Sequence, residues 1–92
     1  MTDLVTRSLT ILNEKGLHAR ASARLVEVVE GFDATAEVIR DGQSASGDSI
    51  MGLLMLAASR GTTIDVQTRG ADAQALADAI ETLVAGRFGE DM

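Results

Sequence analysis

The sequence predicts a two-layer α+β domain, in which helices cover one face of a β-sheet. Three observations predict this class. The 92 residues suffice for one core, so we expect a single domain over residues 1–92. With 46% hydrophobic and 24% charged residues, the composition is typical of a globular protein. Finally, segments in which apolar and polar residues alternate are interspersed with segments in which apolar residues recur at helical spacing.

The first half of the chain predicts a strand, a helix and two further strands. Alternation over residues 4–12 predicts a strand whose buried face is formed by Val5, Leu9 and Ile11. A helix is expected from about His18 to Gly31, with an apolar face formed by Ala21, Leu25, Val28 and Phe32. Residues 34–39 are expected to form the next strand. The dipeptide Asp41-Gly42 then predicts a tight hairpin that leads into a strand over 43–46.

The second half predicts a short helix, a strand and a longer helix. Asp48 or Ser49 is expected to cap an apolar helix over 50–58. Alternation around Ile64 and Val66 predicts a strand. The last helix is expected to begin near residues 71–72, to bury Leu76, Ile80, Leu83 and Val84, and to end near Gly86. We expect residues 89–92 to be frayed.

Charge and composition exclude several classes of function. The net charge is −6, with 14 acidic and 8 basic residues, and the only aromatic residues are two Phe. A nucleic-acid binder normally has a basic face with stacking aromatics, so we expect no nucleic-acid partner. Cysteine is absent, which excludes disulfides and thiolate metal sites. No segment is typical of a membrane span or a signal peptide, so we expect no membrane insertion and a cytoplasmic location.

The most informative segment is Gly16-Leu17-His18-Ala19-Arg20, which joins a glycine loop to a helix start. The first N–H groups of a helix lack intrahelical partners and, with the helix dipole, form an anion site. There the ring of His18 is favoured as a neutral nucleophile, and a phosphoryl group on it would meet these N–H groups. Arg20 would add a guanidinium suited to phosphate oxygens. The alternative is that His18 only caps or packs the helix. A second metal ligand on the same helix face would be expected four residues after His18, but position 22 is Ser. No other cluster of metal ligands is visible, so we expect no metal and no cofactor.

Two segments resemble the signatures of a known family. Residues 16–23, Gly-Leu-His-Ala-Arg-Ala-Ser-Ala, resemble the active-site signature of the HPr family, the histidine-containing phosphocarriers of the bacterial phosphotransferase system. Residues 48–57, Asp-Ser-Ile-Met-Gly-Leu-Leu-Met-Leu-Ala, resemble that family's regulatory-serine signature. The two occur in the right order and at about the right separation, so the resemblance covers nearly the whole chain.

The resemblance implies a fold and a function. The fold would be an open-faced sandwich of order βαββαβα, whose four-stranded antiparallel sheet has strand order 1-4-2-3. His18 would accept, through Nδ1, a phosphoryl group that Enzyme I derives from phosphoenolpyruvate, and would donate it to a histidine of an EIIA-type protein. Arg20 and the N–H groups of Ala19 and Arg20 would hold the phosphate. The chain would be a monomeric, stoichiometric carrier in sugar transport, a protein substrate and not an enzyme.

The resemblance also implies regulation and docking. Ser49 would be phosphorylated by an HPr serine kinase/phosphorylase. The apolar run over residues 50–56 cannot face inward on every side of one helix, so part of it should be exposed. In the family this helix docks the partner proteins, which assigns a docking surface to Ile50, Met51, Leu54 and Met55.

Three departures from the family leave the partners open. Many relatives have proline at the position of Ala21, and the first turn of a helix tolerates either residue. Glu27 and Glu30 weaken the basic rim that relatives use toward acidic partners. Asp48 stands where a basic residue is common and could alter kinase recognition. One alternative is therefore a carrier of the nitrogen-type regulatory branch. Another is a small interaction or ligand-sensing module without phosphoryl chemistry.

Overall fold

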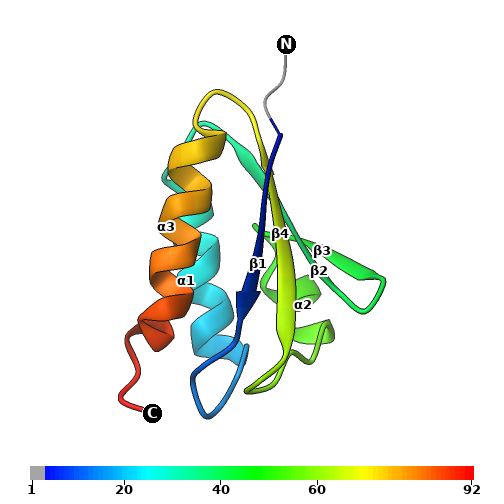
Figure 1. Cartoon of the computed structure of the whole chain (residues 1–92), viewed down its shortest axis with the longest axis vertical. Coiled ribbons are helices and arrows are strands. Elements are labelled where there is room, and N and C mark those ends of the chain that lie inside the picture. The colour runs from blue at the N-terminus through cyan, green and yellow to red at the C-terminus, as the bar shows by residue number, and fades with distance from the viewer. Residues whose placement is uncertain (1–3) are drawn as a thin grey trace.

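The computed structural model describes residues 4–92, and the predicted order of strands and helices is confirmed (Figure 1). A short 3₁₀ helix, η1, follows the last α-helix and was not predicted. The elements are β1 (Leu4–Thr10), α1 (Ala19–Glu30), β2 (Thr35–Arg40), β3 (Gln43–Ser46), α2 (Ile50–Met55), β4 (Thr63–Arg69), α3 (Ala73–Ala85) and η1 (Arg87–Gly89).

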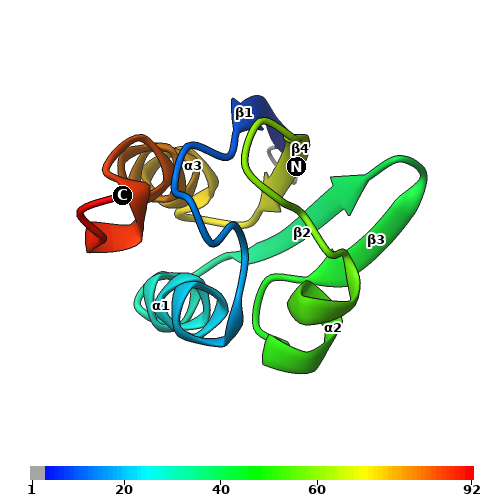
Figure 2. The same ribbon diagram turned by 90° about the horizontal axis from the view of Figure 1, so that it is seen from below.

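The four strands form one antiparallel sheet of order β1-β4-β2-β3, as the family resemblance implies. The long strand β4 is central: it pairs with β1 from Leu4↔Arg69 to Thr10↔Thr63, and with β2 on its other side. Figure 2 shows α1 and α3 side by side against one face of the sheet, with α2 beside β3. The domain is therefore a two-layer sandwich with one open sheet face.

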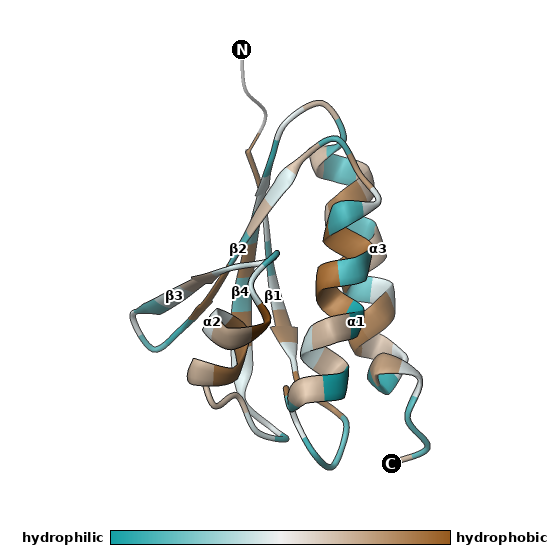
Figure 3. Cartoon of the chain, turned by 180° about the vertical axis from the view of Figure 1, so that it is seen from behind, coloured by the Kyte–Doolittle hydropathy of each residue, from teal (hydrophilic) through white to brown (hydrophobic). Residues whose placement is uncertain are grey.

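The core lies between the sheet and the helices. Figure 3 shows hydrophobic residues, in brown, on the strands and on the helices that cover them. Leu9 and Ile11 are buried while Ser8 and Thr10 are exposed, which confirms the predicted alternation there, whereas Val5 is only partly buried. Side chains with no exposed surface come from both layers, among them Ile11, Leu25, Val38, Leu53, Ile64, Val66, Leu76 and Ile80.

The buried face of α1 differs from the prediction. Val26 and Val29 are buried, whereas Val28 and Phe32 are only partly buried. The reason is that α1 packs against α2 on one side and α3 on the other, which widens its buried stripe beyond one line of residues.

The ends of two elements also differ from the prediction. Strand β1 ends at Thr10 instead of residue 12, and α2 ends at Met55 instead of residue 58. Ala57 adopts a left-handed φ of 51°, which stops the helix. The Arg40 guanidinium donates to the carbonyl oxygen of Leu56 at 2.9 Å and so satisfies a group freed at the helix end.

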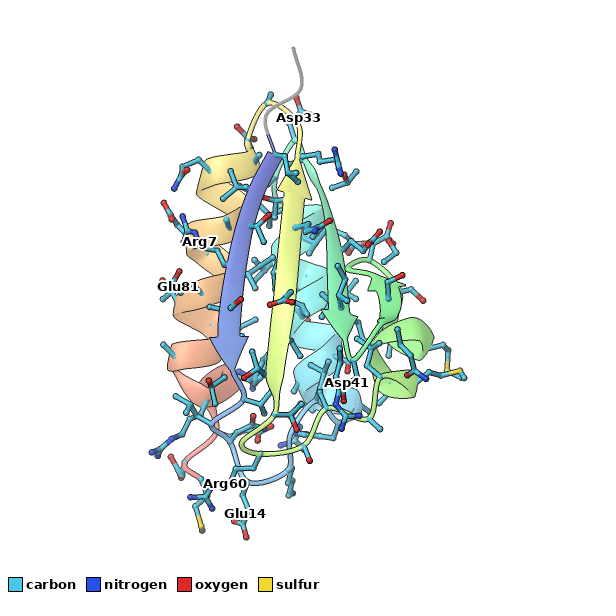
Figure 4. The ribbon with its side chains drawn as sticks, turned by 45° about the vertical axis from the view of Figure 1, so that its right-hand side comes forward. Arg7, Glu14, Asp33, Asp41, Arg60 and Glu81 are labelled. Atoms are coloured by element: carbon cyan, nitrogen blue, oxygen red, sulfur yellow. The ribbon has the colours of Figure 1, made fainter. Side chains whose placement is uncertain are left out.

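Two polar features fix the ends and the edge of the sheet. Asp41 and Gly42 have φ values of 48° and 81°, as a two-residue hairpin turn of the primed type requires. At the opposite edge, Arg7 of β1 bonds to Asp78 at 2.8 Å and to Glu81 at 2.6 Å on α3, and these bonds raise the pKa of Arg7. Figure 4 shows Arg7 and Glu81 together on the outer side of α3, where they join the two layers.

Within residues 4–92, no helix is long and apolar enough to cross a membrane.

Candidate functional site

The loop before α1 is held in place by its backbone. Gly16 has a φ of +65°, and a Cβ there would lie only 2.5 Å from the carbonyl oxygen of Ala58. The adjacent Leu17 N–H donates to the same oxygen at 2.9 Å. Only glycine fits such a close approach with a left-handed backbone. The loop is therefore fixed against the segment that follows α2, and this fixes where His18 begins the helix.

His18 is the N-cap residue of α1, close to the predicted helix start. Its carbonyl oxygen accepts from Ser22 N–H at 2.8 Å, and its side chain makes no capping bond. The N–H groups of Ala19, Arg20 and Ala21 therefore have no intrahelical acceptor. The Ser22 hydroxyl, buried, donates to the Leu17 carbonyl at 3.2 Å. The imidazole, with 26% of its surface exposed, is thus accessible beside free N–H donors and the positive helix end.

The structure adds a partner for His18 that the sequence does not predict. The Nε2 atom of His18 is in hydrogen-bond contact with Oε2 of Glu90, 72 positions away. The other carboxylate oxygen of Glu90 accepts from the side-chain amide of Asn13 at 2.9 Å. Among the residues that the structure describes, Nδ1 of His18 has no hydrogen-bond partner. Residues 89–92 were expected to be frayed, and for Glu90 that expectation is wrong.

A left-handed turn brings Glu90 back to the helix start. Arg87, Phe88 and Gly89 have φ values of 56°, 55° and 79°. The first two are strained for L-residues, and the complete burial of Phe88 in the core compensates for that strain. A Cβ on Gly89 would lie 2.6 Å from Nη1 of Arg24, so glycine permits this passage. No periodic signal in the sequence indicates such a turn. The buried Phe88, two residues after Gly86, is the one clue that this segment packs.

The charge state of Glu90 follows from its surroundings. Desolvation raises the pKa of Glu90, but the hydrogen bonds from Asn13 and His18, together with the charges of His18 and Lys15, outweigh it and hold the pKa below its ordinary value. The carboxylate is therefore ionised at neutral pH and can only accept. The hydrogen in its contact with His18 accordingly belongs to Nε2.

Beside Glu90 lies an open cavity of about 360 Å³ with mixed charge. Its cationic lining comes from Lys15, Arg20 and Arg24. Arg20 is exposed and forms no ion pair within residues 4–92. His18 itself is not part of the lining, but Glu90 belongs to both the cavity wall and the contact with His18. The cavity is completed by Glu14, Gly89, Asp91 and Met92.

The exposed part of α2 agrees with the predicted excess of apolar residues. The exposed fractions are 39% for Ile50, 70% for Met51 and 76% for Met55, while Leu54 is partly buried and Leu53 is buried. Figure 3 shows the hydrophobic colouring of this short helix. It packs against α1, the helix that His18 begins.

Ser49 is the N-cap of α2: its Oγ accepts from the Gly52 N–H at 3.0 Å. Of the two predicted caps, Asp48 is not used, since its carboxylate accepts from the Ser46 hydroxyl instead. No hydrogen bond joins Ser49 to His18 in the described part of the chain. His18 and Ser49, one from each of the two segments that resemble family signatures, thus lie at the starts of two neighbouring helices.

An imidazole with one free nitrogen, unpaired N–H donors and a nearby arginine suit a transferable anionic group such as phosphoryl. Residues 5–86 match the family model described as PTS HPr component phosphorylation site. The chain belongs to the HPr family of the phosphotransferase system. His18 and Ser49 both lie within the residues that match.

Relatives across the family agree over nearly the full chain. The phosphocarrier protein HPr of Cupriavidus necator is 44% identical over 87 residues, which are 95% of this chain and 98% of the relative. The phosphocarrier protein NPr of Shewanella violacea is 43% identical over 84 residues, 91% of this chain and 92% of the relative. Among solved structures, HPr-C-His from Thermoanaerobacter tengcongensis superposes with a TM-score of 0.91 at 30% identity, covering 96% of this chain and 99% of that chain.

Proposed function

We propose that this HPr-family chain is a stoichiometric phosphoryl carrier whose acceptor atom is Nδ1 of His18. The donor is a phosphohistidine of Enzyme I, charged from phosphoenolpyruvate, and the recipient is a histidine of an EIIA-type protein in the cytoplasm. The observation that carries the proposal is the position of the His18 ring. Its Nε2 is occupied by Glu90, while Nδ1 has no partner among the described residues at the start of α1.

The groups around the ring have separate roles in this proposal. The free N–H groups of Ala19 and Arg20 bind phosphoryl oxygens at the positive end of α1. The Arg20 guanidinium, which has no ion pair within residues 4–92, adds a charge-assisted contact. Phosphoryl transfer needs mainly positioning and charge neutralisation, which these groups supply.

Both partners would dock on the apolar residues of α2 that reach the surface: the exposed Ile50, Met51 and Met55 and the partly buried Leu54. The support is that Met51 and Met55 are largely exposed on a helix that packs beside α1. Methionine adapts to different shapes, which suits a surface that must bind two partners in turn. A phosphate on Ser49, placed by an HPr serine kinase/phosphorylase, would add charge at the edge of this surface and hinder docking. The monomeric state stays a prediction.

A nitrogen-type regulatory carrier is the second candidate. The support is that an NPr relative matches almost as closely as an HPr relative, 43% against 44%. Glu27 and Glu30, exposed on α1, also reduce the positive charge that a carrier would offer to acidic partners.

Phosphoryl transfer to purified partners tests both candidates. The chain is incubated with phosphoenolpyruvate and with Enzyme I of the sugar or of the nitrogen type, and then with EIIA proteins of each type. We expect an acid-labile, base-stable phosphoryl group that passes to one type of EIIA. The type that reacts faster identifies the branch. Failure with every Enzyme I would contradict the carrier and favour a module without phosphoryl chemistry.

A further inference from the structure

We propose that Glu90 is a positioning residue for phosphoryl transfer: it keeps a proton on Nε2 of His18 and thereby presents Nδ1 as the nucleophile. This inference rests on the proposed carrier function. It adds a residue that lies outside the two signature-like segments, residues 16–23 and 48–57, and outside residues 5–86, which match the family model. Glu90 touches the ring that reacts, and we assign it no contact with the phosphoryl group.

The contact fixes both the carboxylate and the ring. Oε2 of Glu90 meets Nε2 of His18, and Oε1 accepts from Nδ2 of Asn13 at 2.9 Å. Asn13 is fully buried, and the same Nδ2 donates to the Gly16 carbonyl at 2.8 Å. Because both partners of Nδ2 are acceptors, the amide has one orientation. The His18 ring is thus connected through Glu90 and Asn13 to the loop that precedes it.

The backbone shows that Glu90 is held at this position. The turn over residues 87–89 is left-handed at all three positions, including two residues that are not glycine. Phe88 anchors the turn with no exposed surface, and Gly89 passes close to Arg24. The side chain of Glu90 is only 15% exposed, although it belongs to the last three residues of the sequence. Such strain is maintained only where the surrounding packing compensates for it.

The proton on Nε2 determines whether the leaving group is neutral imidazole or imidazolate when the phosphoryl group is passed on. On acceptance, the Nδ1 lone pair forms the N–P bond while the bond from phosphorus to the donor nitrogen breaks. On donation, the N–P bond breaks and its electron pair returns to Nδ1. If Nε2 keeps its hydrogen throughout, the leaving group is neutral imidazole, and no proton is gained or lost at His18. Without that hydrogen the leaving group would be an imidazolate, which is far more basic and leaves more slowly.

Neighbouring charges supply a matched control. Glu14 and Asp91 line the cavity beside Glu90, and Lys15, Arg20 and Arg24 line it as cations. Helix α2, which packs against α1, carries no charged residue. In the described part of the chain Glu90 is the carboxylate that contacts the His18 ring. Asp91→Asn removes the same charge from the same cavity and leaves that contact in place.

The experiment compares the parent with Glu90→Gln, Glu90→Ala and Asp91→Asn. Ring ¹⁵N NMR at neutral pH reports which nitrogen of His18 carries the hydrogen, and rapid-quench kinetics follow transfer from each phosphorylated form to EIIA. We expect Nε2–H alone in the parent and in Asp91→Asn, and a mixture of tautomers in both Glu90 variants. The maximal transfer rate should fall roughly 10- to 100-fold in Glu90→Ala, the range found when the group that orients a metal-ligating histidine is removed. The concentration of EIIA at half-maximal rate should stay the same.

Two outcomes separate this inference from the carrier proposal. If the parent is phosphorylated but both Glu90 variants keep the parental tautomer and transfer rate, the positioning role is overturned and the carrier stands. If the maximal transfer rate falls as much in Asp91→Asn as in Glu90→Ala, the effect comes from the negative charge of the cavity in general, and the positioning role is also overturned. If the parent is not phosphorylated by any Enzyme I, the carrier proposal fails, and with it this inference.

Discussion

The side-chain amide of Asn13 joins the loop before His18 to Glu90 near the end of the chain. Its nitrogen donates to the Gly16 carbonyl at 2.8 Å and to Oε1 of Glu90 at 2.9 Å, across 77 positions of sequence. Glu90 in turn contacts the His18 ring. The candidate site is therefore built from two segments that are distant in the sequence, and its behaviour should depend on both.

The charge on Glu90 should make part of the stability depend on pH. The pKa of Glu90 is lowered in the folded state, so its contribution to stability is complete above the pKa of the unfolded state and is lost as pH falls through the folded pKa. The parent should therefore exceed Glu90→Gln in free energy of unfolding at about pH 7, and the difference should shrink toward about pH 3. Urea unfolding of both proteins across this range measures it. A difference that is constant or grows on acidification would show that the carboxylate is not stabilised by its partners.

Arg20 should matter for transfer and little for folding. It is exposed and unpaired within residues 4–92, so Arg20→Ala should change the free energy of unfolding by less than about 0.5 kcal/mol. A charge-assisted contact to phosphate is worth about 1.5–3 kcal/mol, which corresponds to roughly 10- to 150-fold in transfer rate. Arg69→Ala removes an exposed arginine at the end of β4 and is the control. Equal transfer rates in the two variants would mean that Arg20 is only solvated.

Met51 should contribute to docking. It is 70% exposed, so Met51→Glu should leave the circular dichroism spectrum and the melting temperature close to the parent's. The new charge would be buried against a partner, and the concentration of Enzyme I or EIIA at half-maximal rate should rise at least about tenfold. Leu4→Glu introduces the same charge at an exposed apolar residue, 49% accessible, on β1, and should have no such effect. Equal effects of the two variants would remove α2 from the docking surface.

Ser49 combines a structural role with the proposed regulatory one, and two variants separate them. Ser49→Ala removes the hydrogen bond to Gly52 N–H and should lower the free energy of unfolding by about 1 kcal/mol. Ser49→Asp keeps a good cap but adds charge beside the exposed residues of α2. It should fold like the parent and require a higher concentration of Enzyme I for phosphorylation of His18. If Ser49→Asp is phosphorylated as readily as the parent, Ser49 is only a cap.

Most of the fold follows from local patterns in the sequence. Alternation located β1 and β4, helical spacing located α1 and α3, and Asp41-Gly42 located the hairpin, because each of these signals is contained within a few neighbouring residues. The strand order is a long-range property: the sequence pattern alone did not give it, and it came from the family resemblance.

The candidate site was predicted only in part for the same reason. The placement of His18 at a helix start and of Ser49 as a cap depends on short-range geometry. The contact with Glu90 depends on a left-handed turn that no residue preference indicates, since Arg87 and Phe88 rarely adopt positive φ. Polar residues near the end of a chain usually fray, and that expectation concealed the role of Glu90.

The most direct test of the carrier function is phosphorylation of the parent and of His18→Ala under identical conditions. His18 is the only histidine of the sequence, and its side chain makes no capping bond, so the variant should fold. With Enzyme I and phosphoenolpyruvate, intact-protein mass spectrometry should show one added phosphoryl group on the parent, lost in acid and retained in base. His18→Ala should show none while keeping the parental circular dichroism spectrum. A folded His18→Ala protein that still acquires an acid-labile phosphoryl group would contradict the account.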